Sequence, residues 1–125
     1  MFFLSIDGDK IGAKLEALII TEELEQASLF SDNVTSAVCL MKKFIQEKRG
    51  MIVFSGGDNI LAKFEDSENS DLIAKGLIQH LNNIFFESTG CTMSIGIGSR
   101  PRDAFLALRL AKGSDTKLID LRCRN

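Results

Sequence analysis

The chain has 125 residues, 45% of them hydrophobic and 26% charged, which is the balance of a soluble globular protein with one core. The formal net charge is −2, so the chain has no overall positive charge that would attract a nucleic-acid polymer. Binding of small anionic ligands stays possible. No apolar run reaches the roughly 18–20 residues of a membrane span, and the early acidic residues argue against a signal peptide. The three widely spaced cysteines fit reduced thiols of a cytoplasmic protein better than a zinc site or a disulfide framework.

The first fifty residues predict one strand and two helices. Phe2–Ile6 is a short apolar run without polar alternation, which is typical of a central strand buried on both faces. Residues 10–26 favour a helix, and the β-branched run Ile19–Thr21 predicts a break or kink in it. Ser31-Asp32 then predicts the start of a second helix, whose apolar stripe ends before Gly50.

The middle of the chain predicts a β-hairpin. Two apolar runs, Met51–Phe54 and Ile60–Phe64, flank the turn sequence Ser-Gly-Gly-Asp-Asn. The glycines of this turn, Gly56 and Gly57, also allow a backbone to approach a ligand closely. The turn therefore presents one acidic side chain, Asp58, at a position where a ligand can bind.

The second half of the chain predicts a helix, a strand, another helix and a last strand. Ser70-Asp71 opens the first helix, and Thr92–Gly98 alternates between large apolar and small residues as a strand does. The small face of that strand indicates that something packs or binds close to it. Pro101 suits the first turn of the next helix, which runs to Lys112, and Thr116–Leu121 forms a candidate last strand.

The order β-α-α-β-β-α-β-α-β predicts an α+β fold, with helices on one face of a mixed, mainly antiparallel sheet. Its βαββαβ core is ferredoxin-like, a topology in which the first strand lies beside a hairpin strand at the centre of the sheet. That adjacency would bring Asp7 and Asp58 together. No repeat, linker or low-complexity stretch divides the chain, so we expect one domain over residues 1–125.

The acidic cluster Asp7-Gly8-Asp9, together with Asp58, predicts a site for Mg²⁺ or Mn²⁺, because hard cations prefer oxygen ligands and assist phosphoryl transfer. If the strand runs straight, we expect Asp7 and Asp9 to point to opposite sides of it, with Asp7 facing Asp58 and the Gly8 carbonyl adding a ligand. Asp9 joins the site if the strand has already turned into the loop. Two protein acids suffice when substrate phosphates complete the coordination. The alternative is that both segments are only turns, since glycine, aspartate and asparagine are turn residues.

Other polar residues have two interpretations each. Asn59 either fixes a ribose hydroxyl or stabilises the hairpin turn, and the turn role is favoured. Lys112 either reaches a triphosphate or caps the end of its helix, and capping is favoured on local sequence alone. His80 is the single histidine, so nucleophilic catalysis of the Ser/His or Cys/His kind has no evident partner residue. A metal-assisted in-line displacement needs no histidine.

Four segments in order, IDGDKIG, FSGGDNILA, TMSIGIG and ALRLAKGSD, resemble the nucleotidyl-cyclase palm domains. These include the GGDEF-type diguanylate cyclases and the polymerase palm of the large subunit of type III CRISPR complexes. The resemblance covers nearly the whole chain and is strongest to the minimal CRISPR polymerases, which are stand-alone palms. It implies a ferredoxin-like palm that uses two divalent metals, joins nucleoside triphosphates into cyclic di- or oligonucleotide signals, releases pyrophosphate and serves antiphage defence.

By position, the resemblance implies that Asp7 and Asp58 bind metal and carry catalysis, with the Gly8 carbonyl as a further metal ligand. It implies that Lys112 contacts phosphates, and it matches Asp9 to the second acid of the first motif. We therefore expect nucleotide contacts from Gly8, Asp9, Gly56, Gly57, Asn59 and Lys112.

The chain departs from the resemblance in two places. Asn59 stands where GGDEF enzymes and many CRISPR palms have a second acid, and Ala13–Ala17 holds no counterpart of the guanine-reading asparagine. The second departure argues against a guanine-specific site, and the resemblance to CRISPR-type palms implies adenine, so ATP is the favoured substrate. Because one palm holds one nucleotide, we expect a homodimer or higher homo-oligomer. The alternatives are a palm-type GTP hydrolase or cyclohydrolase, and a catalytically weakened nucleotide-binding module.

Overall fold

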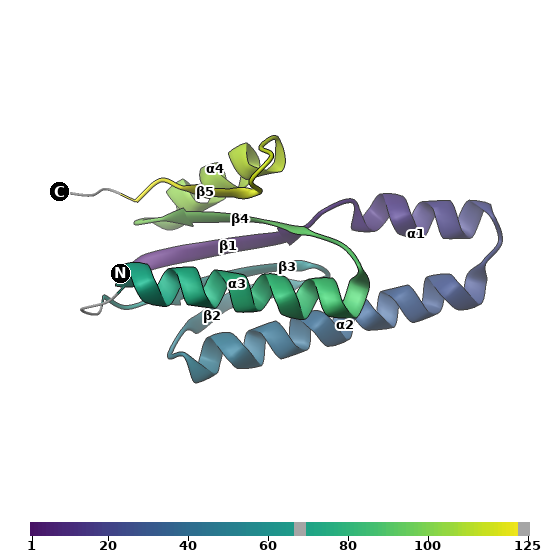
Figure 1. Ribbon diagram of the computed structural model, residues 1–125, viewed down its shortest axis with the longest axis horizontal. Coiled ribbons are helices and arrows are strands. Elements are labelled where there is room, and N and C mark those ends of the chain that lie inside the picture. The colour runs from purple at the N-terminus through teal and green to yellow at the C-terminus, as the bar shows by residue number, and fades with distance from the viewer. Residues whose placement is uncertain (67–69, 123–125) are drawn as a thin grey trace.

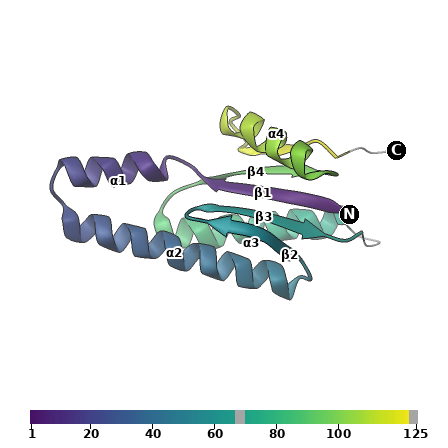
Figure 2. The same ribbon diagram turned by 180° about the vertical axis from the view of Figure 1, so that it is seen from behind.

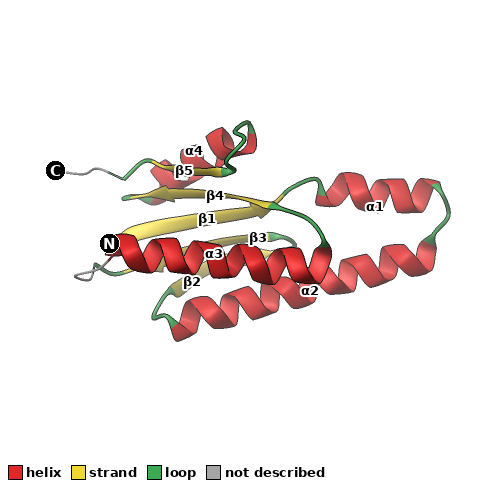
Figure 3. Ribbon diagram, in the orientation of Figure 1, coloured by secondary structure: helices red, strands yellow, loops and turns green. Residues whose placement is uncertain are grey.

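A computed structural model describes residues 1–66 and 70–122. The elements follow the predicted order, and the fold is α+β (Figure 3). They are β1 (Phe2–Gly8), α1 (Ile11–Ile20), α2 (Leu24–Glu47), β2 (Met51–Gly56), β3 (Asn59–Phe64), α3 (Ser70–Thr89), β4 (Met93–Gly98), α4 (Pro101–Lys112) and β5 (Leu118–Asp120).

The five strands form one mixed sheet in the order β2-β3-β1-β4-β5 (Figure 1). All neighbours are antiparallel except β4 and β5, so the sheet is mainly antiparallel, as predicted. The first four strands have the ferredoxin-like arrangement, with β1 between β3 and β4. Asp7 pairs with Asn59 across β1 and β3, which places the end of β1 beside the hairpin turn.

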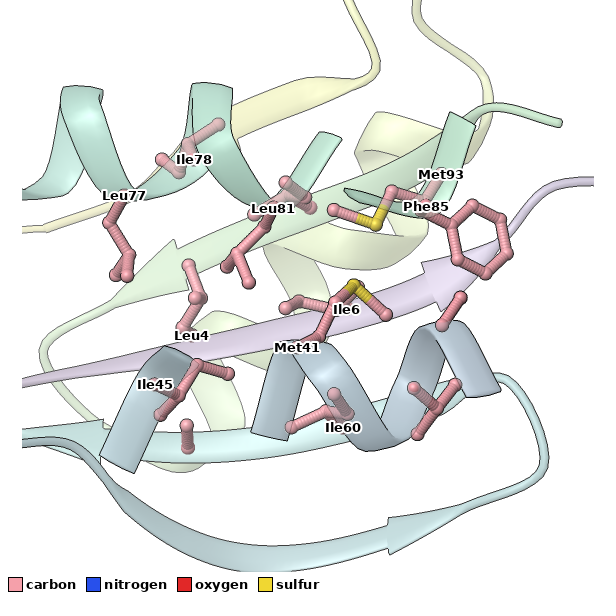
Figure 4. Close-up of a cluster of buried hydrophobic side chains, with 14 of the residues drawn as sticks. Leu4, Ile6, Met41, Ile45, Ile60, Leu77, Ile78, Leu81, Phe85 and Met93 are labelled. Atoms are coloured by element: carbon pink, nitrogen blue, oxygen red, sulfur yellow. The ribbon is translucent and has the colours of Figure 1, made fainter. Parts of the chain in front are cut away.

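The main core lies between one face of the sheet and helices α2 and α3. Figure 4 shows Leu4 and Ile6 of β1 pointing toward Met41 of α2 and Leu81 and Phe85 of α3, and all five side chains are buried. The predicted stripe of α2 supplies much of this layer. At about 25 cal/mol per Å² of buried apolar surface, such a layer is the principal favourable term in folding.

Helix α4 packs on the opposite face, so the prediction that the helices share one face is wrong for this helix. A Cβ built on Gly96 would lie 2.2 Å from the Leu108 backbone nitrogen and 2.4 Å from the Ala104 carbonyl oxygen. The small face of β4 is therefore explained by close helix packing. The buried alanines of α4, which include Ala104 and Ala107, keep the helix at this short distance.

Helix α2 begins seven residues earlier than the predicted start at Ser31-Asp32. The helix α1 is followed by Thr21, whose hydroxyl donates to the Ala17 carbonyl at 3.0 Å. Glu22 then adopts φ 60°, and α2 starts at Leu24. The cap-forming residue types at 31–32 lie exposed within α2 instead. Helix α1 and the first half of α2 extend beyond the end of the sheet as a helical hairpin (Figure 2).

The sequence predicted that the chain has no membrane span and that its cysteines are reduced thiols. None of the helices in residues 1–66 and 70–122 is long and apolar enough to cross a membrane. Cys39 and Cys91 are free thiols, and Cys123 lies outside the described residues.

Candidate active site

The end of β1 and the turn of the β2–β3 hairpin bring Asp7 and Asp58 together. The Gly8 N–H donates to the Asp58 carbonyl oxygen at 3.1 Å, and a Cβ on Gly8 would lie 2.9 Å from the Asp58 carboxylate. Burial raises the pKa of the Asp58 carboxyl, and the negative charge of Asp7 raises it further. Two carboxylates held this close repel each other, so the pair favours a bound cation.

Lys112, the last residue of α4, supplies a cation from this chain. Its ammonium donates to the Gly8 carbonyl at 2.8 Å and lies 3.0 Å from the Asp7 carboxylate and 3.1 Å from the Asp9 carboxylate. Burial alone would lower the pKa of Lys112, but Asp7 and Asp9 raise it, so the ammonium form is stabilised. The favoured local interpretation, helix capping, is therefore incomplete, because the side chain reaches the end of β1.

The prediction that Asp7 and Asp9 point to opposite sides is wrong. Both carboxylates contact the same ammonium, as expected for residues two apart along an extended chain, whose side chains share a face. Asp9 is buried and accepts hydrogen bonds of 2.7 Å from the Thr92 and Ser94 hydroxyls. Burial alone would raise the pKa of Asp9, but these hydroxyls and Lys112 hold it below its ordinary value.

Ser94 and Thr92 are the residues of this network that the sequence analysis did not assign to a site. The alternation of large and small residues placed Ser94 and Thr92 on the small face of this segment. The pattern thus predicted their side of the sheet but not the residue that they contact. Ser94 is fully buried, and its hydroxyl needs a hydrogen-bond acceptor there. Asp9 meets that need, so its oxygens are engaged by protein donors.

Replacing Asp9 by alanine is expected to lower the free energy of unfolding by about 2 kcal/mol at pH 7, because charge-assisted hydrogen bonds are lost and Ser94 is left unpaired. The pKa of Asp9 is lowered on folding, so its contribution is complete above about pH 4 and is lost as the pH falls below its folded-state pKa. Urea unfolding at neutral and acidic pH measures both effects. Asp32→Ala, at an exposed position of α2, is the control and should change stability by less than about 0.5 kcal/mol. An equal loss for both variants would contradict the buried role of Asp9.

The glycines and Asn59 form the tight turn that carries Asp58. Gly57 has φ +56°, a backbone conformation that favours glycine, and the Asn59 side-chain oxygen accepts the Gly56 N–H at 3.1 Å. The structure thus shows the turn role of Asn59. Contacts of Gly56, Gly57 and Asn59 with a nucleotide stay predictions.

The oxygen ligands at the end of β1 fit a divalent metal that arrives with phosphate. In residues 1–66 and 70–122 no group of three or more His, Cys, Asp and Glu side chains is arranged to hold a metal by itself. The carboxylate of Asp7 and the carbonyl of Gly8 nevertheless converge on one cationic atom, the Lys112 nitrogen, and Asp58 lies over Gly8. Oxygen ligands that already share a cation suit Mg²⁺, which typically binds one or two carboxylates plus substrate phosphates.

A cavity of about 390 Å³ lies between the protruding helices and the end of α3. Its lining combines apolar, amide, hydroxyl and charged side chains: Lys14, Leu18, Glu23, Gln26, Leu29, Phe30, Asn33 and Thr89. Helix α1, which forms one wall, starts two residues after Asp9. The volume is in the range of small-molecule pockets.

A solved structure supports the fold independently. The chain resembles the crystal structure of the guanylyl cyclase Cya2 with a TM-score of 0.58 and 19% sequence identity, over 78% of this chain and 52% of the cyclase chain. The match therefore spans about half the length of that cyclase. A comparison with curated protein sequences found no match.

The fold is similar to that of a nucleotidyl cyclase. The chain belongs to the minimal CRISPR polymerase (mCpol) domain family, which it matches over residues 3–120.

Proposed function

We propose that this palm joins ATP into a cyclic di- or oligoadenylate signal with release of pyrophosphate, in antiphage defence. The observation that carries the proposal is the convergence of Asp7, Asp58, the Gly8 carbonyl and the Lys112 ammonium at the end of β1. Carboxylates beside a fixed cation suit the binding and transfer of a phosphorylated substrate.

In the proposed reaction, a ribose hydroxyl of one nucleotide attacks the α-phosphorus of another. An O–P bond forms, the bond to the β-phosphate breaks, pyrophosphate leaves and the hydroxyl proton passes to solvent. Bound Mg²⁺ would neutralise phosphate charge at Asp7, Asp58 and the Gly8 carbonyl. Lys112 would offset the charge of the leaving pyrophosphate, and the Gly56-Gly57 turn would let the backbone approach the nucleotide.

The cavity beside α1 is the proposed site of the base. Adenine presents a donor and an acceptor on one edge, and an asparagine or glutamine amide can pair with both. Asn33 and Gln26 supply such amides, while Phe30 and Leu18 provide apolar walls. The proposal therefore assigns ATP selectivity to the lining of α2.

Replacing Asn33 by alanine is expected to raise the KM for ATP about tenfold, since a bidentate amide contact contributes about 1–3 kcal/mol of discrimination. The turnover number should change little, because Asn33 lies on α2 away from the carboxylates. Steady-state assays of pyrophosphate release measure both constants. Ser36→Ala, one turn further along the exposed side of α2, is the control. A KM unchanged in Asn33→Ala and in Gln26→Ala would place the base elsewhere.

Linking two nucleotides twice requires two palms in opposition, so the proposed enzyme is a homodimer or a higher homo-oligomer. The carboxylate edge of one palm would then face the nucleotide that the other palm holds. Sedimentation velocity with and without ATP and Mg²⁺ tests this arrangement.

The test of the proposed function is incubation of the purified protein with each nucleoside triphosphate and Mg²⁺ or Mn²⁺, with products read by mass spectrometry. A cyclic adenylate plus pyrophosphate is the expected result. Conversion of GTP without a phosphodiester product would identify a hydrolase. Intact ATP despite saturable, metal-dependent binding would identify a binding module.

A further inference from the structure

The Lys112 ammonium lies where a metal ion would be expected. It is 2.8 Å from the Gly8 carbonyl oxygen and 3.0 Å from the Asp7 carboxylate, two of the three ligands assigned to the metal. An ammonium and a metal ion cannot both occupy the same oxygen lone pairs. Two cations that share the Gly8 carbonyl and the Asp7 carboxylate would repel each other at short range, so we expect binding of the metal to displace Lys112 from the Gly8 carbonyl.

Asp9 offers Lys112 a second acceptor that does not belong to the metal ligands. Its carboxylate is 3.1 Å from the lysine nitrogen and is fixed by the hydroxyls of Thr92 and Ser94 at 2.7 Å each. Ser94 is held in the centre of the sheet on β4, so this acceptor is rigid. A lysine released from Gly8 would still be held at the site by Asp9.

We propose that Lys112 occupies the cation position until a metal ion binds, and that Asp9 is the positioning residue that then keeps its ammonium at the nucleotide phosphates. This inference rests on the proposed function for the phosphate contact, but the displacement step concerns metal binding alone. The exchange of the Lys112 ammonium for the metal ion keeps a positive charge beside the Asp7 and Asp58 carboxylates, both before and after the metal binds. It also weakens the binding of a metal ion that arrives without the oxygens of a nucleotide.

Removing Lys112 should therefore have opposite effects on two ligands. In Lys112→Met, the affinity for Mn²⁺ alone is expected to rise at least tenfold, because the competing ammonium is gone. The affinity for a non-hydrolysable ATP analogue with Mg²⁺ is expected to fall about tenfold, because a phosphate contact is lost. Mn²⁺ binding is measured by electron paramagnetic resonance, and analogue binding by calorimetry.

Two controls separate displacement from general electrostatics and from misfolding. Lys10→Met removes an exposed positive charge next to Asp9 and should change Mn²⁺ affinity less than twofold. In the unaltered protein, the NMR signals of the Lys112 side chain should shift on titration with Mg²⁺, which requires no variant. Equal Mn²⁺ affinities in Lys112→Met and the parent protein, or Lys112 signals unmoved at saturating Mg²⁺, would overturn the displacement.

The positioning role of Asp9 is tested by combining variants. Asp9→Asn should weaken analogue binding, and the double variant Asp9→Asn/Lys112→Met should bind no more weakly than Lys112→Met alone, because Asp9 acts through the lysine. Additive losses would overturn this role. The Mn²⁺ titrations decide the displacement even if no cyclic product is ever formed, so failure of the proposed function is distinguishable from failure of this inference.

Discussion

Replacing Asp58 by asparagine is expected to lower the rate of phosphodiester formation by at least about 10³-fold. Charge stabilisation by a metal contributes several kcal/mol to a transition state, and each 1.36 kcal/mol is a factor of ten in rate. Asparagine keeps the size of the side chain but removes the charge that pairs with Asp7. Pyrophosphate release and mass spectrometry of the products measure the loss, and Asp7→Asn should reproduce it.

The stability of Asp58→Asn should not fall, and this separates a catalytic role from a structural one. The pKa of Asp58 is raised on folding by burial and by Asp7, so at neutral pH its charge opposes folding. Removing that charge should leave the free energy of unfolding equal or higher. Asp32→Asn, on the exposed side of α2, is the control for activity. Loss of activity in step with loss of stability would indicate that Asp58 only supports the turn.

The local pattern of the sequence predicted most of the architecture. The unbroken apolar run of Phe2–Ile6 predicted a central strand, and the glycine turn predicted the hairpin beside it. Together they placed Asp7 near Asp58, because the ferredoxin-like topology leaves few ways to order the strands. That part of the site follows from the order of the elements and from the sheet topology that this order favours.

The rest of the site depends on partners far apart in the chain. Lys112 meets Asp9 across 103 residues, and its local sequence is equally that of a helix end. The face of α4 that meets the sheet is set by glycines on β4, where only a helix backbone can approach so closely. The start of α2 at Leu24 was missed because Ser31 and Asp32 are common cap residues that tertiary packing retained inside a helix.

Gly96 connects the packing of α4 to the site, and Gly96→Ala is expected to cost at least about 3 kcal/mol of unfolding free energy. The added Cβ would lie 2.2 Å from the Leu108 backbone nitrogen, which cannot rotate away as a side chain can. The loss of stability should therefore be at the upper end of the range for overpacked cores. Urea unfolding measures the loss. Gly76→Ala is the matched control: Gly76 lies exposed on α3 with no atom within 4 Å of the added carbon, and alanine there should stabilise by about 0.5–1 kcal/mol.

The same substitution should also move Lys112, because α4 carries it. A helix pushed away from β4 withdraws the ammonium from the Gly8 carbonyl while Asp7 and Asp58 stay in place on β1 and the hairpin. Folded Gly96→Ala protein at low temperature should therefore resemble Lys112→Met, with stronger binding of Mn²⁺ alone and weaker binding of the ATP analogue. Wild-type values for both ligands, in a variant that has lost stability, would show that the position of Lys112 does not depend on the contact between α4 and β4.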